Sequence, residues 1–180
     1  TKRLDRIVNQ IVDYARPREL SPVLCPLNDL VDEVVKLLDS TVTAKHLAVT
    51  RSISPTLTRL HADRDQIKQV LLNVVQNAID ASHEGTAIEV TAFELPRSQN
   101  AGMVIKVTDH GVGIPDGALA HVFEPFFTSG KRQGTGLGLA ICRNIIESHG
   151  GDIQVTSEAG KGTSVRIWLP LRQEFQFVEG

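Results

Sequence analysis

The chain has 180 residues, of which 41% are hydrophobic and 22% charged, and its formal net charge is −2. This length and composition fit one globular domain with a real core, and the near-neutral charge excludes bulk electrostatic attraction to nucleic acid or anionic membranes. No apolar run reaches the ~18–20 residues of a membrane span and no signal peptide opens the chain. We therefore expect a cytoplasmic piece, although its parent protein can still be membrane-anchored.

The N-terminal part of the chain alternates helical and extended patterns. Apolar residues at helical spacing predict a helix over residues 1–16, which packs either on a partner helix outside the compact domain or back onto its own domain. The proline-containing stretch Pro17–Pro26 predicts an extended linker. Asn28 is predicted to cap a second helix, and an alternating pattern predicts a strand at Leu47–Ile53. The expected buried positions of the second helix are Leu30, Val31, Val34, Val35, Leu37 and Leu38.

A third helix, predicted from an Asp65 cap to about Ser82, has two distinct faces. The core face is expected to hold Ile67, Val70, Leu71, Val74, Ala78 and Ala81. The polar arc is expected to hold Gln69, Asn73, Gln76, Asn77 and Asp80. Asn73 and Asn77 lie four residues apart, so their side chains are neighbours. An amide oxygen is a neutral, hard ligand that suits a Mg²⁺ ion already carrying phosphate oxygens and water, although the helix taken alone fits a solvated polar face equally well.

The second half of the chain is predicted to contain four strands and one helix. The strands are Ile88–Leu95, Met103–Asp109, Ile153–Ser157 and Ser164–Leu169. The first two of them form a hairpin, and the glycine-rich stretch Gly111–Gly136 that follows predicts a mobile loop. A helix is predicted at Leu137–His149. Helices with mostly antiparallel strands, without regular βαβ alternation, predict an α+β two-layer sandwich in which a mixed, mostly antiparallel sheet of about five strands packs on three helices.

Two glycine motifs indicate a nucleotide site. The sequence DHGVGIP follows a predicted strand directly, so the Asp109 carboxylate can turn into a pocket and accept a hydrogen bond from the adenine N6 amine, while the glycines let a ligand approach the backbone. The sequence GTGLGLA opens a helix, where backbone N–H groups and the helix dipole favour phosphate. Taken singly, the first motif also fits a plain turn, and the segment Gly160–Thr163 alone favours a hairpin turn.

Five blocks in this order resemble the sensor histidine kinases. DQIKQVLLNVVQNAIDAS, DHGVGIP, VFEPFFTSG, GTGLGLA and GKGTSV are similar to the N, G1, F, G2 and G3 boxes of that family, which belongs to the GHKL superfamily of ATP-binding α/β sandwiches. The compact segment from EPFF to GTGLGL looks most like the nitrogen-regulation branch. The resemblance implies a remnant of a dimerisation-domain helix at 1–16, a linker at 17–27, an ATP-binding catalytic domain at 28–170 and a C-terminal tail at 171–180.

The resemblance also assigns roles to single residues. Asn77 would coordinate Mg²⁺, Asn73 would support the metal or the phosphates, and either Lys131 or Arg132 would contact phosphate, since Gly130 intervenes where the branch usually carries a lysine. The catalytic residues implied are Asn73, Asn77 and Lys131. The nucleotide-binding residues implied are Asn73, Asn77, Asp109, Gly111, Gly113, Ile114, Phe123, Lys131, Arg132, Gly134, Thr135, Gly136, Leu137, Gly138 and Thr163. Phe123, Phe126 and Phe127 would anchor the hinge of an ATP lid.

The function implied is transfer of the γ-phosphoryl group of Mg-ATP to a histidine on a dimerisation domain. The parent would be a homodimer, its further partner a response regulator receiver domain, and no nucleic acid would bind. None of the six histidines matches a phosphoacceptor, His83-Glu84 being nearest, so the chain is expected to be a fragment that cannot autophosphorylate. One alternative is a GHKL-type ATP hydrolase, which is disfavoured because Asn73 stands where hydrolases carry a glutamate base. The other is a nucleotide-binding regulatory module.

Overall fold

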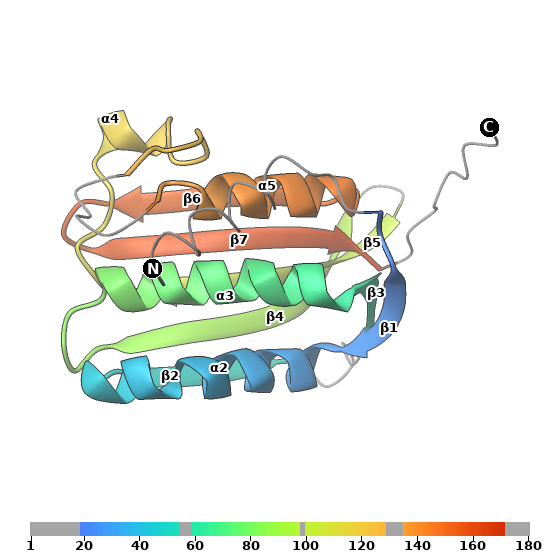
Figure 1. Ribbon diagram of the computed structural model, residues 1–180, viewed down its shortest axis with the longest axis horizontal. Helices are drawn as coiled ribbons and strands as arrows, with labels where there is room; N and C mark the ends of the chain where they lie inside the picture. Colours follow the sequence, from blue (N-terminus) through green and yellow to red (C-terminus); the bar gives the residue numbers. More distant parts are fainter. Residues whose placement is uncertain (1–18, 55–58, 98–99, 129–134, 172–180) are drawn as a thin grey trace, which may run out of the picture.

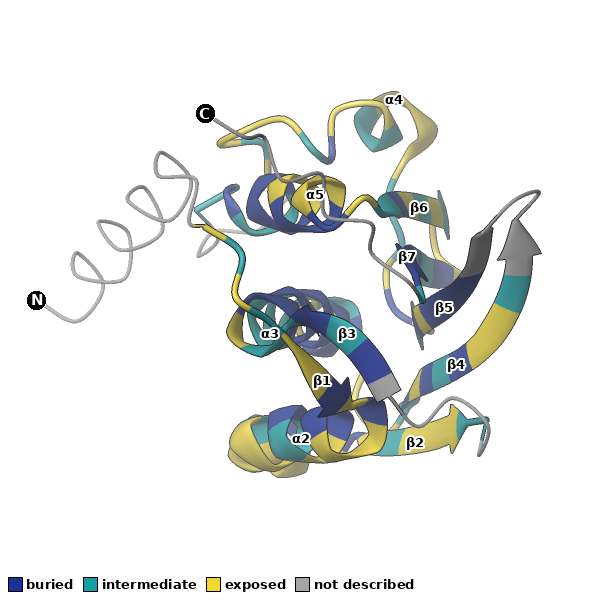
Figure 2. Cartoon of the chain, turned by 90° about the vertical axis from the view of Figure 1, so that its right-hand side faces the viewer, coloured by how far each residue is buried: buried dark blue, intermediate teal, exposed yellow. Residues whose placement is uncertain are grey.

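A sheet and a layer of helices make up the part of the chain that the computed structural model describes, residues 19–54, 59–97, 100–128 and 135–171. The strands are β2 (Ala48–Ile53), β4 (Ala87–Arg97), β5 (Asn100–Asp109), β6 (Asp152–Glu158) and β7 (Gly162–Pro170). They are ordered β2-β4-β5-β7-β6, with β2 parallel to β4 and the other pairs antiparallel. Helices α2 (Leu27–Ala44), α3 (Arg64–Ala81) and α5 (Gly138–Ser148) cover one face of this sheet, with α3 in the middle (Figures 1 and 2). The predicted α+β two-layer sandwich is confirmed.

The alternation of side chains along the strands explains why the sheet and the helices pack together. In the central strands, Ile105 and Val107 of β5 lie opposite Ile167 and Val165 of β7, and all four are buried. Because alternate residues of a strand point to the same face, these side chains form one apolar surface under the helices. The core face of α3 is also buried as expected, at Ile67, Val70, Leu71, Val74 and Ala78. This packing fixes α3 above the centre of the sheet, with its polar arc at the side.

The N-cap of α3 differs from the prediction by two residues. The helix begins at Arg64, and Asp63 caps it, because the Asp63 carboxylate accepts a hydrogen bond from the Gln66 backbone N–H at 3.1 Å. Asp63 has the extended backbone that a cap requires, whereas Asp65 lies inside the first helical turn. The predicted Asp65 cap is therefore wrong.

The predicted cap of the second helix is also wrong. Helix α2 begins at Leu27 with Pro26 in the cap position, and no side chain caps it. Asn28 therefore lies within the first turn and is exposed. The buried face of α2 is shorter than predicted, since Leu37 is 55% exposed while Leu30, Val31 and Val34 are fully buried.

Part of the predicted linker is a strand. Residues Pro22–Pro26 form β1, which pairs antiparallel with β3 (Arg59–Asp63), and together they make a separate two-stranded sheet within the described residues. The segment is extended, as predicted, but it is hydrogen-bonded into the fold, and Cys25 is buried at this end of the core. Strand β3 was absent from the sequence prediction, because Leu60 and Ala62 are its only apolar residues.

A buried histidine joins the end of α5 to the start of α3. His149 is 2% exposed, its Nε2 accepts a hydrogen bond from the Asp63 backbone N–H at 3.0 Å, and its Nδ1 lies 2.7 Å from the Ile145 carbonyl oxygen. These partners require a neutral ring that carries its proton on Nδ1. Burial lowers the pKa of His149 below its usual 6.5. His149 therefore has a packing role in the core.

The remaining elements follow the predicted order. The hairpin strands β4 and β5 extend further towards each other than expected, and α5 has Leu137 and His149 as its two caps. Within the predicted loop Gly111–Gly136 the structure has a short helix, α4 (Asp116–Leu119), followed by turns. Both cysteines, Cys25 and Cys142, are free and buried. The helix predicted at 1–16 lies outside the described residues, and none of the described helices is long and apolar enough to cross a membrane.

Candidate functional site

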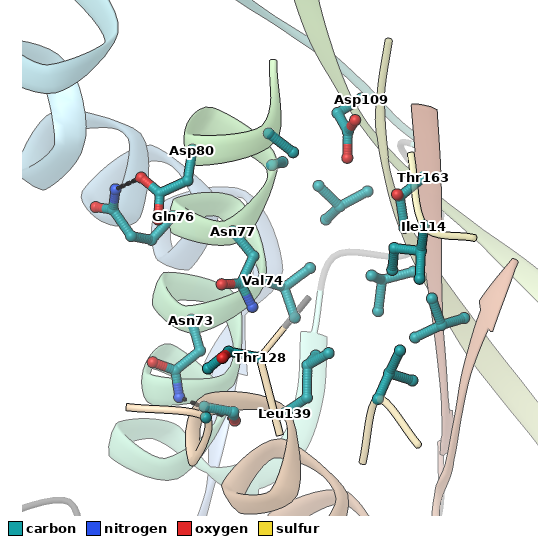
Figure 3. Close-up of a pocket in the computed structure, with 18 of the residues that line it drawn as sticks. Asn73, Val74, Gln76, Asn77, Asp80, Asp109, Ile114, Thr128, Leu139 and Thr163 are labelled. Atoms are coloured by element: carbon teal, nitrogen blue, oxygen red, sulfur yellow. Dashed lines mark hydrogen bonds between the residues drawn. The ribbon is translucent and has the colours of Figure 1, made fainter. Parts of the chain in front are cut away.

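A pocket opens between the polar arc of α3 and the inner face of β5 and β7 (Figure 3). The first turn of α5 and the segment after β5 complete its wall. Asp109 and Thr163 lie at one end of it, whereas Asn73 and Asn77 are spaced along α3 (Figure 3). The pocket therefore has two chemically distinct polar ends separated by an apolar middle.

The wall on α3 presents amide side chains. The Asn73 amide nitrogen donates to the Gly138 carbonyl oxygen at 3.4 Å. This hydrogen bond ties α3 to the first residue of α5 and does not use the Asn73 amide oxygen. Gln76 donates to the Asp80 carboxylate at 2.8 Å, so this carboxylate lies along the helix surface. Asn77 follows Asn73 by one helical turn, as the sequence predicted, and both line the pocket.

Asp109, the last residue of β5, is 5% exposed. Its carboxylate accepts a hydrogen bond from the Gly111 backbone N–H at 3.0 Å, which fixes the side chain against its own loop. In the β5–β7 register Asp109 lies directly opposite Thr163, so the two side chains are close neighbours on the same face. Two oxygen-bearing groups therefore meet at this end of the pocket.

An apolar floor separates the two polar ends. Val107 of β5, Val165 of β7 and Val155 of β6 are consecutive partners across the three strands, and all three line the pocket. Val74 of α3, Leu139 of α5 and Ile114 add to the apolar lining. Of these residues, only Ile114 was predicted from the sequence to belong to the site. The alternation of the strands could have suggested the valines, but only the register shows that they form one surface.

Two glycines after β5 allow very close backbone packing. A Cβ atom on Gly111 would lie 2.0 Å from the Ala81 carbonyl oxygen, at the end of α3. Gly113 has a φ of +65°, and its Cβ would lie 2.0 Å from the Glu158 carbonyl oxygen. Any side chain at either position would push the loop away from α3 or from β6. These glycines therefore act by bringing the loop onto the pocket rim, and only Gly113 lines the pocket itself.

The phenylalanines of the segment VFEPFF have different environments. Phe123 packs against the core, with the Arg143 guanidinium 4.0 Å from the centre of its ring. Phe126 is 66% exposed with a φ of +67°, and its backbone N–H donates to the Gly136 carbonyl oxygen at 2.9 Å. Phe127 lines the pocket together with Thr128, which sequence reasoning missed. The hydrogen bond between Phe126 and Gly136 holds both ends of the intervening segment together.

Most of the predicted site residues meet in this one pocket. Those that line it are Asn73, Asn77, Asp109, Gly113, Ile114, Thr135, Gly136, Gly138 and Thr163. Gly111, Phe123 and Leu137 do not line it, and Leu137 is fully buried in the core. Lys131, Arg132 and Gly134 lie outside the described residues. Over the described ranges, no three His, Cys, Asp or Glu side chains gather as a metal site.

A model of the family described as histidine kinase-, DNA gyrase B- and HSP90-like ATPase matches residues 62–173. The chain belongs to this family. The match begins in β3 and ends just after β7, so it includes every element that forms the pocket.

Relatives within the family are sensor histidine kinases. ZraS of Escherichia coli (strain K12) is 40% identical over 169 residues, which are 94% of this chain and 35% of ZraS. The chain therefore spans about a third of the length of this curated relative. Full-length ShkA in complex with AMPPNP matches 94% of this chain and 36% of its own with a TM-score of 0.81 and 26% identity. ThkA in complex with the response regulator TrrA matches 95% of this chain and 48% of its own, with a TM-score of 0.74 and 32% identity.

Proposed function

We propose that this chain is the catalytic domain of a two-component sensor histidine kinase, which binds Mg-ATP and transfers its γ-phosphoryl group to a histidine on a dimerisation domain. One observation carries the proposal: a single pocket has a buried carboxylate at one end, two asparagines of α3 along its side, and an apolar floor between them. That order of polar, apolar and polar surfaces fits the amino edge, the ring and the phosphates of ATP.

At the base end, Asp109 would accept a hydrogen bond from the adenine N6 amine. Its buried carboxylate is held in place by Gly111, so its orientation is fixed before the ligand arrives. The purine ring would lie on the valines of the floor, where burial of apolar surface contributes about 25 cal/mol per Å². These contacts would position the nucleotide, and the residues that make them would take no part in the reaction.

At the phosphate end, the amide oxygens of Asn77 and Asn73 are suitable ligands for Mg²⁺ that is already bound to phosphate. When bound, the ion would neutralise the charge that develops on the transferred phosphoryl group. The first residues of α5, beginning at Gly138, present backbone N–H groups and the positive end of the helix dipole to an anion. Either Lys131 or Arg132 would add a cation.

Transfer to histidine fits these residues better than ATP hydrolysis does. An imidazole is itself a nucleophile, so the domain needs to position and neutralise rather than to remove a proton. Hydrolysis needs a base for water, and Asn73, whose amide donates to Gly138, has no basic atom to offer. The similarity to sensor histidine kinases supports the same choice.

The partners and domain organisation belong to the same proposal. Residues 1–16 would be the remnant of a dimerisation-domain helix, 17–27 its connection to the catalytic domain at 28–170, and 171–180 a tail. The parent protein would be a homodimer that passes phosphate to a response regulator, as the complex of ThkA with TrrA suggests by analogy.

Phosphoryl transfer in trans tests this function. The chain is mixed with Mg²⁺, γ-labelled ATP and a separately produced dimerisation domain that carries the phosphoacceptor histidine, and the label on that domain is followed. Acid-labile label on the dimerisation domain, lost when its histidine is replaced by glutamine, is the expected result. Release of free phosphate without transfer would indicate a hydrolase, and ATP binding without either reaction would indicate a regulatory module.

A further inference from the structure

Three side chains with hydrogen-bonding oxygens form a row across the sheet at the base end of the pocket. Asp109 of β5 is the register partner of Thr163 in β7, and Thr163 is the partner of Ser157 in β6. The next row on the same face is Val107, Val165 and Val155. The polar row therefore borders the apolar floor. Its outermost member, Ser157, lies on the far side of Thr163 from Asp109 and does not line the pocket.

The Ser157 hydroxyl has three partners. It accepts a hydrogen bond from the Ile114 backbone N–H at 2.8 Å. Its oxygen lies 2.8 Å from the Gly162 carbonyl oxygen and 2.9 Å from the Thr163 hydroxyl oxygen. One small side chain thus joins the loop after β5, the turn between β6 and β7, and the pocket residue Thr163.

The direction of these hydrogen bonds follows from the donors available. A carbonyl oxygen can only accept, so the single proton of Ser157 goes to Gly162. The Thr163 hydroxyl must then donate its own proton to the Ser157 oxygen, because otherwise the two oxygens would face each other without a hydrogen between them. The Thr163 hydroxyl can then only accept hydrogen bonds from a ligand in the pocket. The neighbouring Asp109 carboxylate, when it is ionised, can also only accept.

We infer that Ser157 is a positioning residue for nucleobase selection. It accepts the hydrogen bond that the Thr163 hydroxyl donates, so that the base end of the pocket presents acceptors only. Such an end favours a purine with an amino group at position 6, which is a double donor. It rejects a purine with a 6-oxo group, which is an acceptor. The inference rests on the proposed nucleotide-binding function and adds to it the residue that sets the polarity of Thr163.

The ratio of ADP to IDP affinity tests the inference, because the two nucleotides share the same phosphates and sugar, and their bases differ in the group at position 6 and in the hydrogen that hypoxanthine carries on N1. Calorimetry with Mg²⁺ on the full chain should show a preference for ADP. In Ser157→Ala the Thr163 proton is free to point into the pocket and donate to a 6-oxo group. The ADP preference should then fall roughly three- to tenfold, the value of one neutral hydrogen bond.

Three further variants make the result decisive. Ser157→Thr keeps the hydroxyl and should keep the preference. Thr163→Val leaves Ser157 in place but removes the acceptor, so it should lower the preference even if Ser157→Ala does not fold. Thr156→Ala, one position earlier on the opposite face of β6, should leave both affinities unchanged.

Two results would overturn the inference, and they are distinguishable. If Ser157→Ala weakens ADP and IDP equally, or weakens neither, Ser157 has only a structural role and the proposed function is untouched. If the parent chain binds neither nucleotide, the proposed function itself fails, and the inference fails with it.

Discussion

Asp109 provides the sharpest test of the base end at the scale of a single residue. Asp109→Asn keeps the shape of the side chain and can still accept from Gly111, but it removes the charge that strengthens a hydrogen bond to adenine N6. A charge-assisted hydrogen bond contributes ~1.5–3 kcal/mol, so we expect ADP to bind roughly 10–150-fold more weakly, measured by calorimetry. Asp116→Asn, an exposed position in α4, is the matched control and should have no effect. Unchanged ADP affinity in Asp109→Asn would remove this residue from the site.

Asn77 is the corresponding test of the phosphate end. In Asn77→Ala the proposed ligand amide is lost while the helix is not weakened, because alanine has the highest helix propensity. We expect ATP binding to lose most of its dependence on Mg²⁺ and to change little in its absence, measured by calorimetry with and without the ion. Gln69→Ala, on the same helix but away from the pocket lining, serves as the control. An equal loss under both conditions would show that Asn77 acts in some way other than as a metal ligand.

The start of α3 shows what a single cap contributes at the scale of an element. The Asp63 carboxylate accepts from the Gln66 backbone N–H and from the Ser21 backbone N–H, so it joins the helix to the segment that precedes β1. Asp63→Ala should lower the free energy of unfolding by about 0.5–2 kcal/mol, measured by urea denaturation. Asp65→Ala removes an exposed first-turn charge and should change it by roughly 0.5 kcal/mol or less. A larger loss for Asp65→Ala than for Asp63→Ala would contradict the observed cap.

The stability of the whole molecule should depend on pH through His149. Its pKa is lowered in the folded chain, so as pH falls the unfolded chain takes up a proton first, near pH 6.5, while the folded chain resists. The stability that His149 confers is therefore complete above about pH 6.5 and is lost as pH falls below it. Urea denaturation between pH 7.5 and 5 should show this decline, and His149→Gln should reduce its slope. An identical slope in both proteins would assign the pH dependence to other groups.

At each scale the sequence determined what depends on local pattern. The periodicity of the chain was enough to predict α3 with its two faces, α5, the hairpin strands and the two-layer sandwich. The motifs, taken in order, were enough to select residues that line one pocket, among them Asp109, Asn73 and Asn77. Helix caps were less certain from the sequence, because Asp63 and Asp65 are the same residue type two positions apart, and only the backbone conformation distinguishes them.

The tertiary structure decided whatever depends on residues distant in the sequence. Strand β1 pairs with β3, although Cys25 and Leu60 are 35 positions apart, and no local pattern specifies such a partner. The valine floor and the row of Asp109, Thr163 and Ser157 exist only because the register brings β5, β7 and β6 together. Hydrophobic alternation fixes which face a side chain occupies, but hydrogen bonding between strands fixes which side chains become neighbours, and the chemistry of this pocket depends on those neighbours.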